Sequence, residues 1–512
     1  MTRQSDLVLV NPGDRAGVYQ SLGAAMAAIE PPIWAGMMAS AVRHHGFSCA
    51  ILDANAEGLS PDQAADRIAE MAPRLVAVVV YGHNPSASTP LMPASGALCA
   101  AVKRKDPGLK VLLVGGHVAA LPERSLREEA ADFVAGGEGV YTLLDLLEAL
   151  RAGRGADVSR VRDLWYREGE AVRVGPPAPL LKDLEREMPG VAWDLLPMER
   201  YRAHNWHCFG DLERQPYAAL YTTLGCPYGC TFCCIQAPFK SGERAAGYRA
   251  EVNSYRSWSP EVVIRQIDTL VNEFGVRNIK FADEMFVLNR RHVLGICDLI
   301  IQRGYPLNIW AYARVDTARD PELLDRLKAA GFNWLAFGIE AGTDRVRDDI
   351  QKGFGQDAIL ATMEKVKAAG IFVGANYIFG LPEDDLASMQ ATLDLALELN
   401  GEYANFSAAM AYPGSKLYAQ ALREGWPLPG DWGGFSQYST DTLPLGTKYL
   451  PGVEVLGFRD KAFQTYFSSP HYLDMIGRTF GVGTALYIKE MLGHKLVRGG
   501  TATPDRHTPA PG

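Results

Sequence analysis

The sequence contains no apolar stretch long enough to cross a membrane, and its beginning lacks the apolar core of a secretion signal. The first six residues are mostly polar, and the apolar run that follows, Leu7 to Val10, is short. We therefore expect a cytoplasmic protein with no membrane span.

Positive charge is also scarce. Lysine and arginine number 51 against 59 aspartate and glutamate residues, which gives a net charge of −8 and a pI near 5.8. Domains that bind DNA or RNA usually carry a basic surface. The composition therefore predicts no nucleic-acid partner.

Cysteine is sparse as well, with eight residues in 512. Four of them crowd into positions 226 to 234, and the others are scattered. This distribution does not fit a disulfide framework, whose cysteines are spread along a small secreted domain. It indicates a reducing compartment and one local site of metal chemistry.

The first part of the chain alternates short apolar runs with amphipathic stretches, a pattern typical of a parallel sheet covered by helices on both faces. We predict an α/β, doubly wound, Rossmann-like domain over residues 1–150. Such sheets bind ligands at the carboxyl ends of their strands. The expected strands are Leu7–Val10, Cys49–Leu52, Leu75–Val80, Lys110–Val114 and Asp132–Val134, and small or polar residues follow each of them.

Residues 151–215 break this pattern and are predicted to be a linker, with a hairpin around Val161–Val174. A second strand–helix series occupies residues 216–414, and its six strands predict a partial (β/α)6 barrel of the TIM type. The expected strands are Ala219–Thr223, Asn278–Ala282, Asn308–Tyr312, Trp334–Gly338, Ile371–Phe379 and Tyr403–Ala408. The expected helices are Pro260–Phe274, Pro321–Ala330, Gln356–Ala369 and Asp385–Leu399.

The last part of the chain has longer helical patterns, at Gly452–Phe467 and Tyr472–Leu492. We predict a C-terminal helical region over 415–498. The remaining segment, 499–512, is rich in glycine, proline and threonine and is expected to be a disordered tail.

The cysteine cluster has the spacing Cys-x3-Cys-x2-Cys at Cys226, Cys230 and Cys233. Structural zinc and a fully ligated iron–sulfur cluster both need four protein ligands, so three cysteines leave one metal position open. The alternative is a zinc site whose fourth ligand is His207, Cys208 or Cys234. Because the cysteines directly follow the first barrel strand, they are expected at the mouth of the barrel, where such folds build their active sites.

The same run, with the aromatic residue Phe232 before the last cysteine, resembles the signature of radical S-adenosylmethionine (SAM) enzymes. The resemblance implies that Cys226, Cys230 and Cys233 hold a [4Fe-4S] cluster and that SAM occupies the open iron. The cofactors would then carry the difficult chemistry, and the protein would supply position and the exclusion of water.

Further strand ends match this family. The resemblance implies SAM contacts from an acidic pair, an arginine, a glutamate and an adenine-binding turn, with Ala341 and Asn376 departing from the residues usual in the family. The residues implied are Asp283, Glu284, Arg314, Glu340, Ile378 and Gly380.

The first domain is similar to the cobalamin-binding domain of cobalamin-dependent radical SAM enzymes, on its segments Gly115-Gly116-His117 and Gly136-Gly137-Glu138-Gly139. The motif Asp-x-His-x-x-Gly, which offers a histidine to cobalt in other cobalamin proteins, is absent from the sequence. His83 and His117 stay conceivable axial ligands, although we expect the lower face of cobalamin to lack a protein histidine. The implied cobalamin contacts are Tyr81, Ser86, Gly115, Gly116, His117, Gly137 and Glu138.

In this family the usual activity is methyl transfer. The resemblance therefore implies methylation of an unactivated carbon of a small-molecule substrate, through a 5′-deoxyadenosyl radical and methylcobalamin, with electrons from an external donor of the flavodoxin or ferredoxin type. The alternatives are a cyclase or ring-rearranging enzyme with the same cofactors, and a non-catalytic cobalamin carrier or sensor. The sequence does not identify the substrate.

Overall fold

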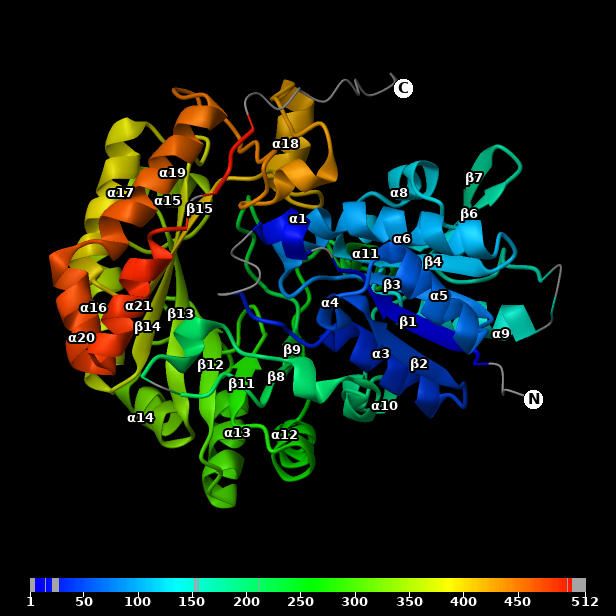
Figure 1. Ribbon diagram of the computed structural model, residues 1–512, viewed down its shortest axis with the longest axis horizontal. Helices are drawn as coiled ribbons and strands as arrows, with labels where there is room; N and C mark the ends of the chain where they lie inside the picture. Colours follow the sequence, from blue (N-terminus) through cyan, green and yellow to red (C-terminus); the bar gives the residue numbers. More distant parts are fainter. Residues whose placement is uncertain are drawn as a thin grey trace.

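The computed structural model describes residues 5–13, 15–20, 27–151, 153, 156–210, 212–494 and 496–499. Two α/β units lie side by side, the first blue to cyan and the second green to yellow, and helices near the C-terminus cover the outer side of the second (Figure 1). The structure confirms the predicted α/β class, with a doubly wound first sheet and a partial barrel.

The first sheet has the strand order β2-β1-β3-β4-β5-β6-β7, and its first five strands are parallel. The order reverses between β1 and β3, which is the kind of crevice where open α/β sheets bind ligands. Its strands are β1 (Leu7–Asn11), β2 (Cys49–Asp53), β3 (Leu75–Val80), β4 (Lys110–Gly115), β5 (Phe133–Ala135), β6 (Leu164–Glu168) and β7 (Ala171–Val174).

The two faces of this sheet belong to different cores. Along β1, Leu7 and Leu9 lie in the core that continues into the second unit, whereas Val8 and Val10 pack under the outer helices. This alternation explains why the strands are apolar throughout, since both faces are covered. The main helices are α3 (Ile33–His44), α5 (Pro61–Met71), α6 (Met92–Lys105), α8 (Pro122–Glu128) and α9 (Val140–Arg151); the short ones are α1 (Arg15–Tyr19), α4 (Ala54–Glu57), η1 (Pro85–Leu91) and α7 (Gly116–Ala120).

The predicted hairpin forms, but its place in the fold differs from the expectation. Strands β6 and β7 add to the edge of the first sheet, with Trp165 opposite Val134 in antiparallel register. The linker segment therefore contributes to the first unit before it crosses to the second. It continues through α10 (Leu184–Glu187), η2 (Trp193–Leu195), η3 (Met198–Arg200) and η4 (Asn205–Cys208).

The second sheet is parallel throughout, in the order β8-β11-β12-β13-β14-β15, which confirms the six-stranded partial barrel. The strands are β8 (Tyr217–Leu220), β11 (Asn278–Phe281), β12 (Asn308–Ala313), β13 (Phe332–Glu340), β14 (Phe372–Phe379) and β15 (Tyr403–Ala408). The helices are α11 (Lys240–Ala245), α12 (Pro260–Phe274), α13 (Arg290–Arg303), α14 (Pro321–Ala329), α15 (Asp344–Asp349), α16 (Gln356–Ala368) and α17 (Leu386–Leu399).

The first barrel strand ends earlier than predicted. After Leu220 the chain turns, and Thr223–Leu224 forms a separate short strand, β9, paired antiparallel with β10 (Arg256–Ser257). The cause is Asp283, whose carboxylate accepts hydrogen bonds from the Thr222 backbone N–H at 3.0 Å and from the hydroxyls of Thr222 and Thr223.

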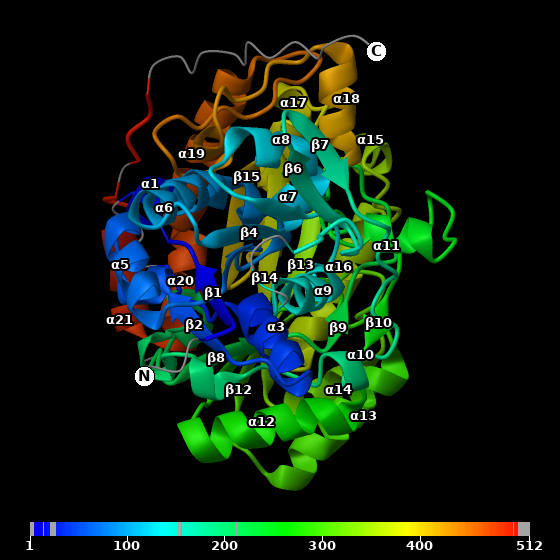
Figure 2. The same ribbon diagram turned by 90° about the vertical axis from the view of Figure 1, so that its right-hand side faces the viewer.

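The C-terminal region is helical, as expected, but the predicted helix Tyr472–Leu492 was wrong as a single element. Gly481 lies between two helices with φ +90°, a conformation that a helix cannot continue through. The elements are α18 (Lys416–Glu424), η5 (Trp432–Phe435), α19 (Gly452–Phe467), α20 (Pro470–Phe480) and α21 (Val482–Met491). Of the expected disordered tail, residues 500–512 lie outside the described residues. Figure 1 shows α19 to α21 on the side of the barrel away from the first sheet, and in Figure 2, which looks from the side of the first unit, they lie behind it.

None of the helices in the described ranges combines the length and apolarity that a membrane crossing requires.

Candidate active site between the two sheets

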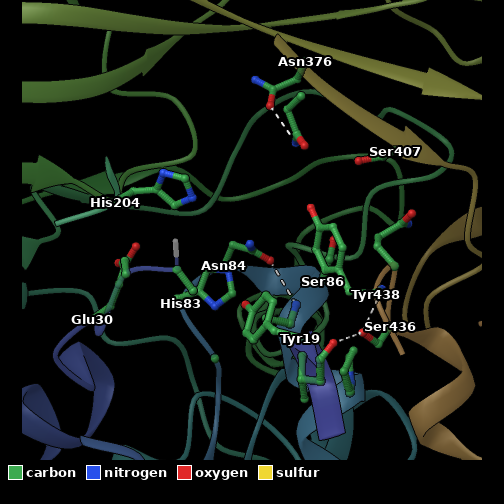
Figure 3. A pocket seen from close by; sticks show the side chains of 18 of the residues that line it. Tyr19, Glu30, His83, Asn84, Ser86, His204, Asn376, Ser407, Ser436 and Tyr438 are labelled. Atoms are coloured by element: carbon green, nitrogen blue, oxygen red, sulfur yellow. Dashed lines mark hydrogen bonds between the residues drawn. The ribbon is translucent and has the colours of Figure 1, made fainter. Parts of the chain in front are cut away.

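A cavity of about 970 Å³ opens between the strand ends of the first sheet and the interior of the barrel. This volume is at the upper end of the range for pockets that take one drug-sized ligand. The lining comes from every part of the chain, including the linker and the C-terminal helices. Figure 3 shows side chains from opposite walls pointing into one open space, with Asn376 facing His83, Tyr19 and Tyr438 across it.

The cysteine loop begins where β9 ends. Gly225 has φ +86°, and a Cβ there would overlap the backbone carbonyl of Ser254, so only glycine fits at this position. The Cys226 backbone N–H donates to the Gln236 side chain at 3.0 Å. Gln236 in turn donates to buried Glu243 at 2.6 Å, which also accepts from Ser254. This buried network fixes the path of the loop.

The three cysteines of the signature all keep partly exposed side chains, and Cys233 lines the central cavity. Burial raises the pKa of Cys226 to about 11, and coordination to a metal would favour its thiolate. Among the described residues, no three His, Cys, Asp or Glu side chains converge on a single-ion site.

The proposed fourth zinc ligands have other contacts. His207 lies 3.0 Å from the carbonyl of Asn308, and Cys208 donates to the side chain of Asn278. Cys234 is buried beside Ser86 of the first unit, and burial raises its pKa to about 12. These contacts speak against the zinc interpretation.

Arg314 lies against the cysteine loop, although it does not line the central cavity. Its guanidinium carbon sits 3.8 Å from the centre of the Tyr228 ring, and it pairs with Asp316 at 3.0 Å. It also donates to the carbonyl of Lys352 at 2.6 Å. Arg314 is therefore placed to support the loop and to present positive charge beside it.

Glu340 ends β13 in a left-handed conformation with φ +68° and accepts a hydrogen bond from Lys352 at 2.6 Å. Both side chains are less than one-tenth exposed, so the pair is a buried ion pair. In this structure Glu340 has a protein partner and does not line the central cavity.

The two predicted acidic residues after β11 differ in position. Asp283 is fully buried and holds the Thr222–Thr223 turn, and burial raises its pKa to about 6. Glu284 lines the cavity, and burial raises its pKa to about 8. Only Glu284 is thus available to a ligand.

In the predicted adenine-binding turn, too, only one of the two predicted residues lines the cavity. Ile378 and Phe232 line the cavity, and both pack against the same small apolar cluster, which contains Leu381. Gly380 instead forms a tight turn with φ +81°, and its N–H donates to Asp384 at 3.0 Å. A Cβ at Gly380 would overlap Val455 of α19, so close packing is a sufficient reason for this glycine.

In the first unit, Tyr81 and Ser86 line the cavity. The Tyr81 ring stacks on Trp34 at 4.0 Å, and its hydroxyl donates to the carbonyl of Glu138 at 3.0 Å. His83 extends into the same space, and burial lowers its pKa to about 4, so it is a neutral imidazole at pH 7.

Gly116 and His117 line a second, smaller cavity of about 30 Å³. Nδ1 of His117 lies 3.1 Å from the hydroxyl of Thr89, and Nε2 is buried without a partner among the described residues. Burial lowers the pKa of His117 to about 3. The Gly115 backbone lies so close to the carbonyl of Val80 that a Cβ at position 115 would overlap it.

Gly137 and Glu138 face the barrel and lie outside both cavities. A Cβ at Gly137 would crowd Ser241, and Glu138 accepts two hydrogen bonds from Arg256, at 3.1 and 2.8 Å, and one from the backbone of Leu181. Glu138 therefore joins the two units through a buried ion pair.

Several cavity residues were not predicted from the sequence. They include an ion pair between Glu30 and Lys280, the residue Tyr19, and polar side chains deep in the barrel. A signal was present, since Lys280 interrupts an apolar strand and a buried lysine requires a partner. The deep polar residues are His204, Asn376, Asn405 and Ser407.

The residues present fit the expected cofactors. The thiols of the cysteine loop suit iron, and the cavity joins Cys233 to the strand ends after β1, β2 and β3, where a large ligand would lie on the first sheet. The fold and site together define an enzyme in which a doubly wound ligand-binding domain faces a partial barrel with a three-cysteine loop.

The comparisons with known proteins identify this class. The B12 binding domain model matches residues 19–147, and the radical SAM superfamily model matches residues 220–396. The chain is a radical SAM enzyme with a B12 binding domain, and its cofactors are a [4Fe-4S] cluster, SAM and cobalamin.

Among its relatives, an uncharacterized methyltransferase of Pyrococcus horikoshii is 28% identical over 91% of this chain and 93% of its own. An anaerobic magnesium-protoporphyrin IX monomethyl ester cyclase of Cereibacter sphaeroides is 28% identical over 82% of this chain and 64% of its own. The solved cobalamin-dependent SAM radical enzyme OxsB, with aqua-cobalamin and SAM bound, has a similar fold, with a TM-score of 0.68 at 14% identity over 95% of this chain and 70% of its own.

Proposed function

We propose that this enzyme transfers a methyl group to a carbon atom of a small-molecule substrate. When bound, the cluster and SAM supply a radical that abstracts hydrogen, and cobalamin supplies the methyl group. The observation that carries the proposal is the single cavity shared by Cys233 and the strand ends of the first sheet. A relative whose name is methyltransferase, matched over almost the whole length of both chains, supports it.

In this proposal residues 1–150 bind cobalamin and residues 216–414 bind the cluster and SAM. Cys226, Cys230 and Cys233 ligate iron, while Glu284 and Ile378 contact SAM from the cavity wall. Arg314 acts on the cysteine loop through its contacts with Tyr228 and Lys352. Tyr81, Ser86 and His83 face the corrin side, and the linker and C-terminal helices exclude water by closing the cavity.

The test is an anaerobic assay of the reconstituted enzyme with SAM carrying a labelled methyl group and a small-molecule extract as substrate source. We expect 5′-deoxyadenosine and a labelled small-molecule product together, both lost in Cys233→Ala. An enzyme that forms neither would contradict the proposal.

A second candidate is oxidative ring closure, favoured by the relative named as a cyclase. The same assay separates the two functions. A cyclase would form 5′-deoxyadenosine and consume a substrate without placing the labelled methyl group in any product.

We also propose an external electron donor of the flavodoxin or ferredoxin type. The support is Lys416, which is exposed and donates to the carbonyl of Gly229 in the cysteine loop at 3.2 Å. An acidic donor would be attracted to this lysine. Lys416→Glu should weaken the salt-dependent reduction of the cluster by such a donor, while reduction by dithionite stays unchanged.

A further inference from the structure

We call the deep end of the cavity the barrel floor. On β14, Asn376 lies two positions before Ile378, so the two side chains are on the same face of the strand and Asn376 is further from the strand's carboxyl end, inside the barrel. Asn405 is the register partner of Asn376 on β15. The barrel floor consists of His204, Trp206, Trp310, Asn376, Tyr403 and Asn405, all of which line the cavity.

Three aromatic rings form the walls of the barrel floor. Trp206 and Tyr403 have ring centres 4.8 Å apart, and Trp310 lies 5.9 Å from Tyr403 at a steep angle. Aromatic side chains from the linker and two barrel strands therefore pack into one cluster that lines the cavity. Such walls favour a flat ring, which gains stacking and edge contacts that an aliphatic ring of the same size does not.

His204 presents a hydrogen-bond donor to this space. Its Nδ1 accepts from the Trp206 backbone N–H at 3.3 Å, so in the neutral ring the proton sits on Nε2. Burial, together with the positive charges of Arg214 and Lys280, holds the pKa of His204 well below its ordinary value. The ring is therefore neutral, and its Nε2–H faces the cavity side (Figure 3).

The asparagine pair presents an acceptor. Asn376 donates to the carbonyl of Phe337 and accepts from the Asn405 amide, each at 3.1 Å. These two bonds fix the orientation of both amides, so the Asn405 carbonyl oxygen is left for a ligand. The donor on His204 and this acceptor line the same cavity.

The barrel floor offers no net charge. None of its six residues is ionised. The cations around it have protein partners: Lys280 pairs with Glu30 at 2.9 Å and Arg459 with Asp460 at 2.8 Å, and Arg214 donates to the carbonyls of Ala203 and Ala27. A ligand charge placed here would lose its hydration without gaining an opposite charge.

We propose that the substrate places an uncharged, planar heteroaromatic ring in the barrel floor, accepting a hydrogen bond from His204 Nε2–H and donating one to the Asn405 side-chain oxygen. This inference rests on the proposed function, since it names the substrate class of the same cavity. It assigns His204 and Asn405 as specificity-determining residues.

The test measures binding of small probe rings by isothermal titration calorimetry, using enzyme loaded with the cluster, cobalamin and SAM and without reductant. Pyridone carries both a donor and an acceptor, indole only a donor, benzoate a charge, and cyclohexanol no aromatic ring. We expect pyridone to bind tightest, indole next, and benzoate and cyclohexanol at least tenfold more weakly than pyridone. Equal or tighter binding of benzoate or cyclohexanol would overturn the proposal.

Variants locate the site. His204→Phe keeps a ring beside Trp206 and removes the donor, so pyridone should bind about fivefold to tenfold more weakly while indole is unaffected. Asn405→Ala should weaken both, and His471→Ala, on the exposed side of α20, should change neither. Unchanged pyridone binding in a folded His204→Phe protein overturns the assignment; if that variant does not fold, unchanged binding in Asn405→Ala does so.

The outcome is separable from that of the methyl-transfer assay. The probes are bound and not methylated, so an enzyme that binds pyridone but labels no product contradicts the proposed function alone. An enzyme that labels a product but shows no preference among the probes contradicts the barrel-floor proposal alone.

Discussion

Lys352 donates a hydrogen bond of 2.6 Å to Glu340, and both side chains are nearly inaccessible to solvent. The carbonyl of Lys352 also accepts from Arg314, which lies over Tyr228 of the cysteine loop. One buried ion pair thus connects the end of β13 with the loop that carries the cysteines.

Lys352→Met should destabilise the protein by about 3–5 kcal/mol, because it leaves the Glu340 carboxylate buried without a partner. The measurement is urea unfolding followed by circular dichroism. Arg326→Met is the matched control, since it breaks an exposed ion pair with Asp298 and should cost less than about 1 kcal/mol. Equal losses in the two variants would show that the buried pair has no special role.

Cys233 and Cys234 should differ completely in metal binding. Cys233→Ser should abolish the iron–sulfur absorbance after reconstitution, because two thiolates cannot replace three. Cys234→Ser should retain it, because that thiol is buried beside Ser86 of the first unit. Iron and sulfide analysis of both proteins provides the check, and loss of the cluster in Cys234→Ser would refute the assignment.

Asp283→Asn should change how stability depends on pH. Burial raises the pKa of Asp283 to about 6, so the folded protein binds a proton more tightly than the unfolded chain. Its contribution to stability is therefore greatest below about pH 4 and is lost as the pH rises toward 6. The variant lacks this titration and can keep the acceptor oxygen for Thr222 and Thr223.

We therefore expect the free energy of unfolding of Asp283→Asn, relative to the native protein, to rise by up to about 3 kcal/mol between pH 4 and pH 7. Urea titrations at several pH values give this difference directly. A difference that stays flat across the range would mean that Asp283 titrates normally.

Gly380→Ala should destabilise the protein by about 2–4 kcal/mol, because the position has φ +81° and an added Cβ would overlap Val455. Gly275→Ala is the matched control: it has φ +65° but open space around it, so it should cost only about 1 kcal/mol. If the two variants lose the same stability, the packing against α19 is not tight.

The regular elements were largely predictable because their signals are local. Helix α12 matches its predicted bounds, since Ser259 caps its start, Pro260 occupies its first turn and Gly275 ends it in a left-handed conformation. Strand β15 also matches. The helix predicted over Tyr472–Leu492 failed because its apolar pattern continues through Gly481, whereas the backbone does not.

The candidate site was predictable only where a residue's role is carried by a motif. From the cysteine spacing and the strand ends, the sequence predicted five residues that line the cavity: Cys233, Glu284, Ile378, Tyr81 and Ser86. Other motif residues are taken up by protein partners: Glu138 by Arg256, and Glu340 by Lys352. Such pairings join segments far apart in sequence, and a single sequence does not show them.

The walls of the central cavity come from residues between Asn11 and Leu496, so no stretch of the chain contains the site by itself. During synthesis, the first sheet can fold long before α19 has left the ribosome. The walls of the central cavity are complete only when nearly the whole chain has been made. Any cofactor that arrives earlier meets an open surface, and lasting retention of the cofactors is therefore a property of the finished protein.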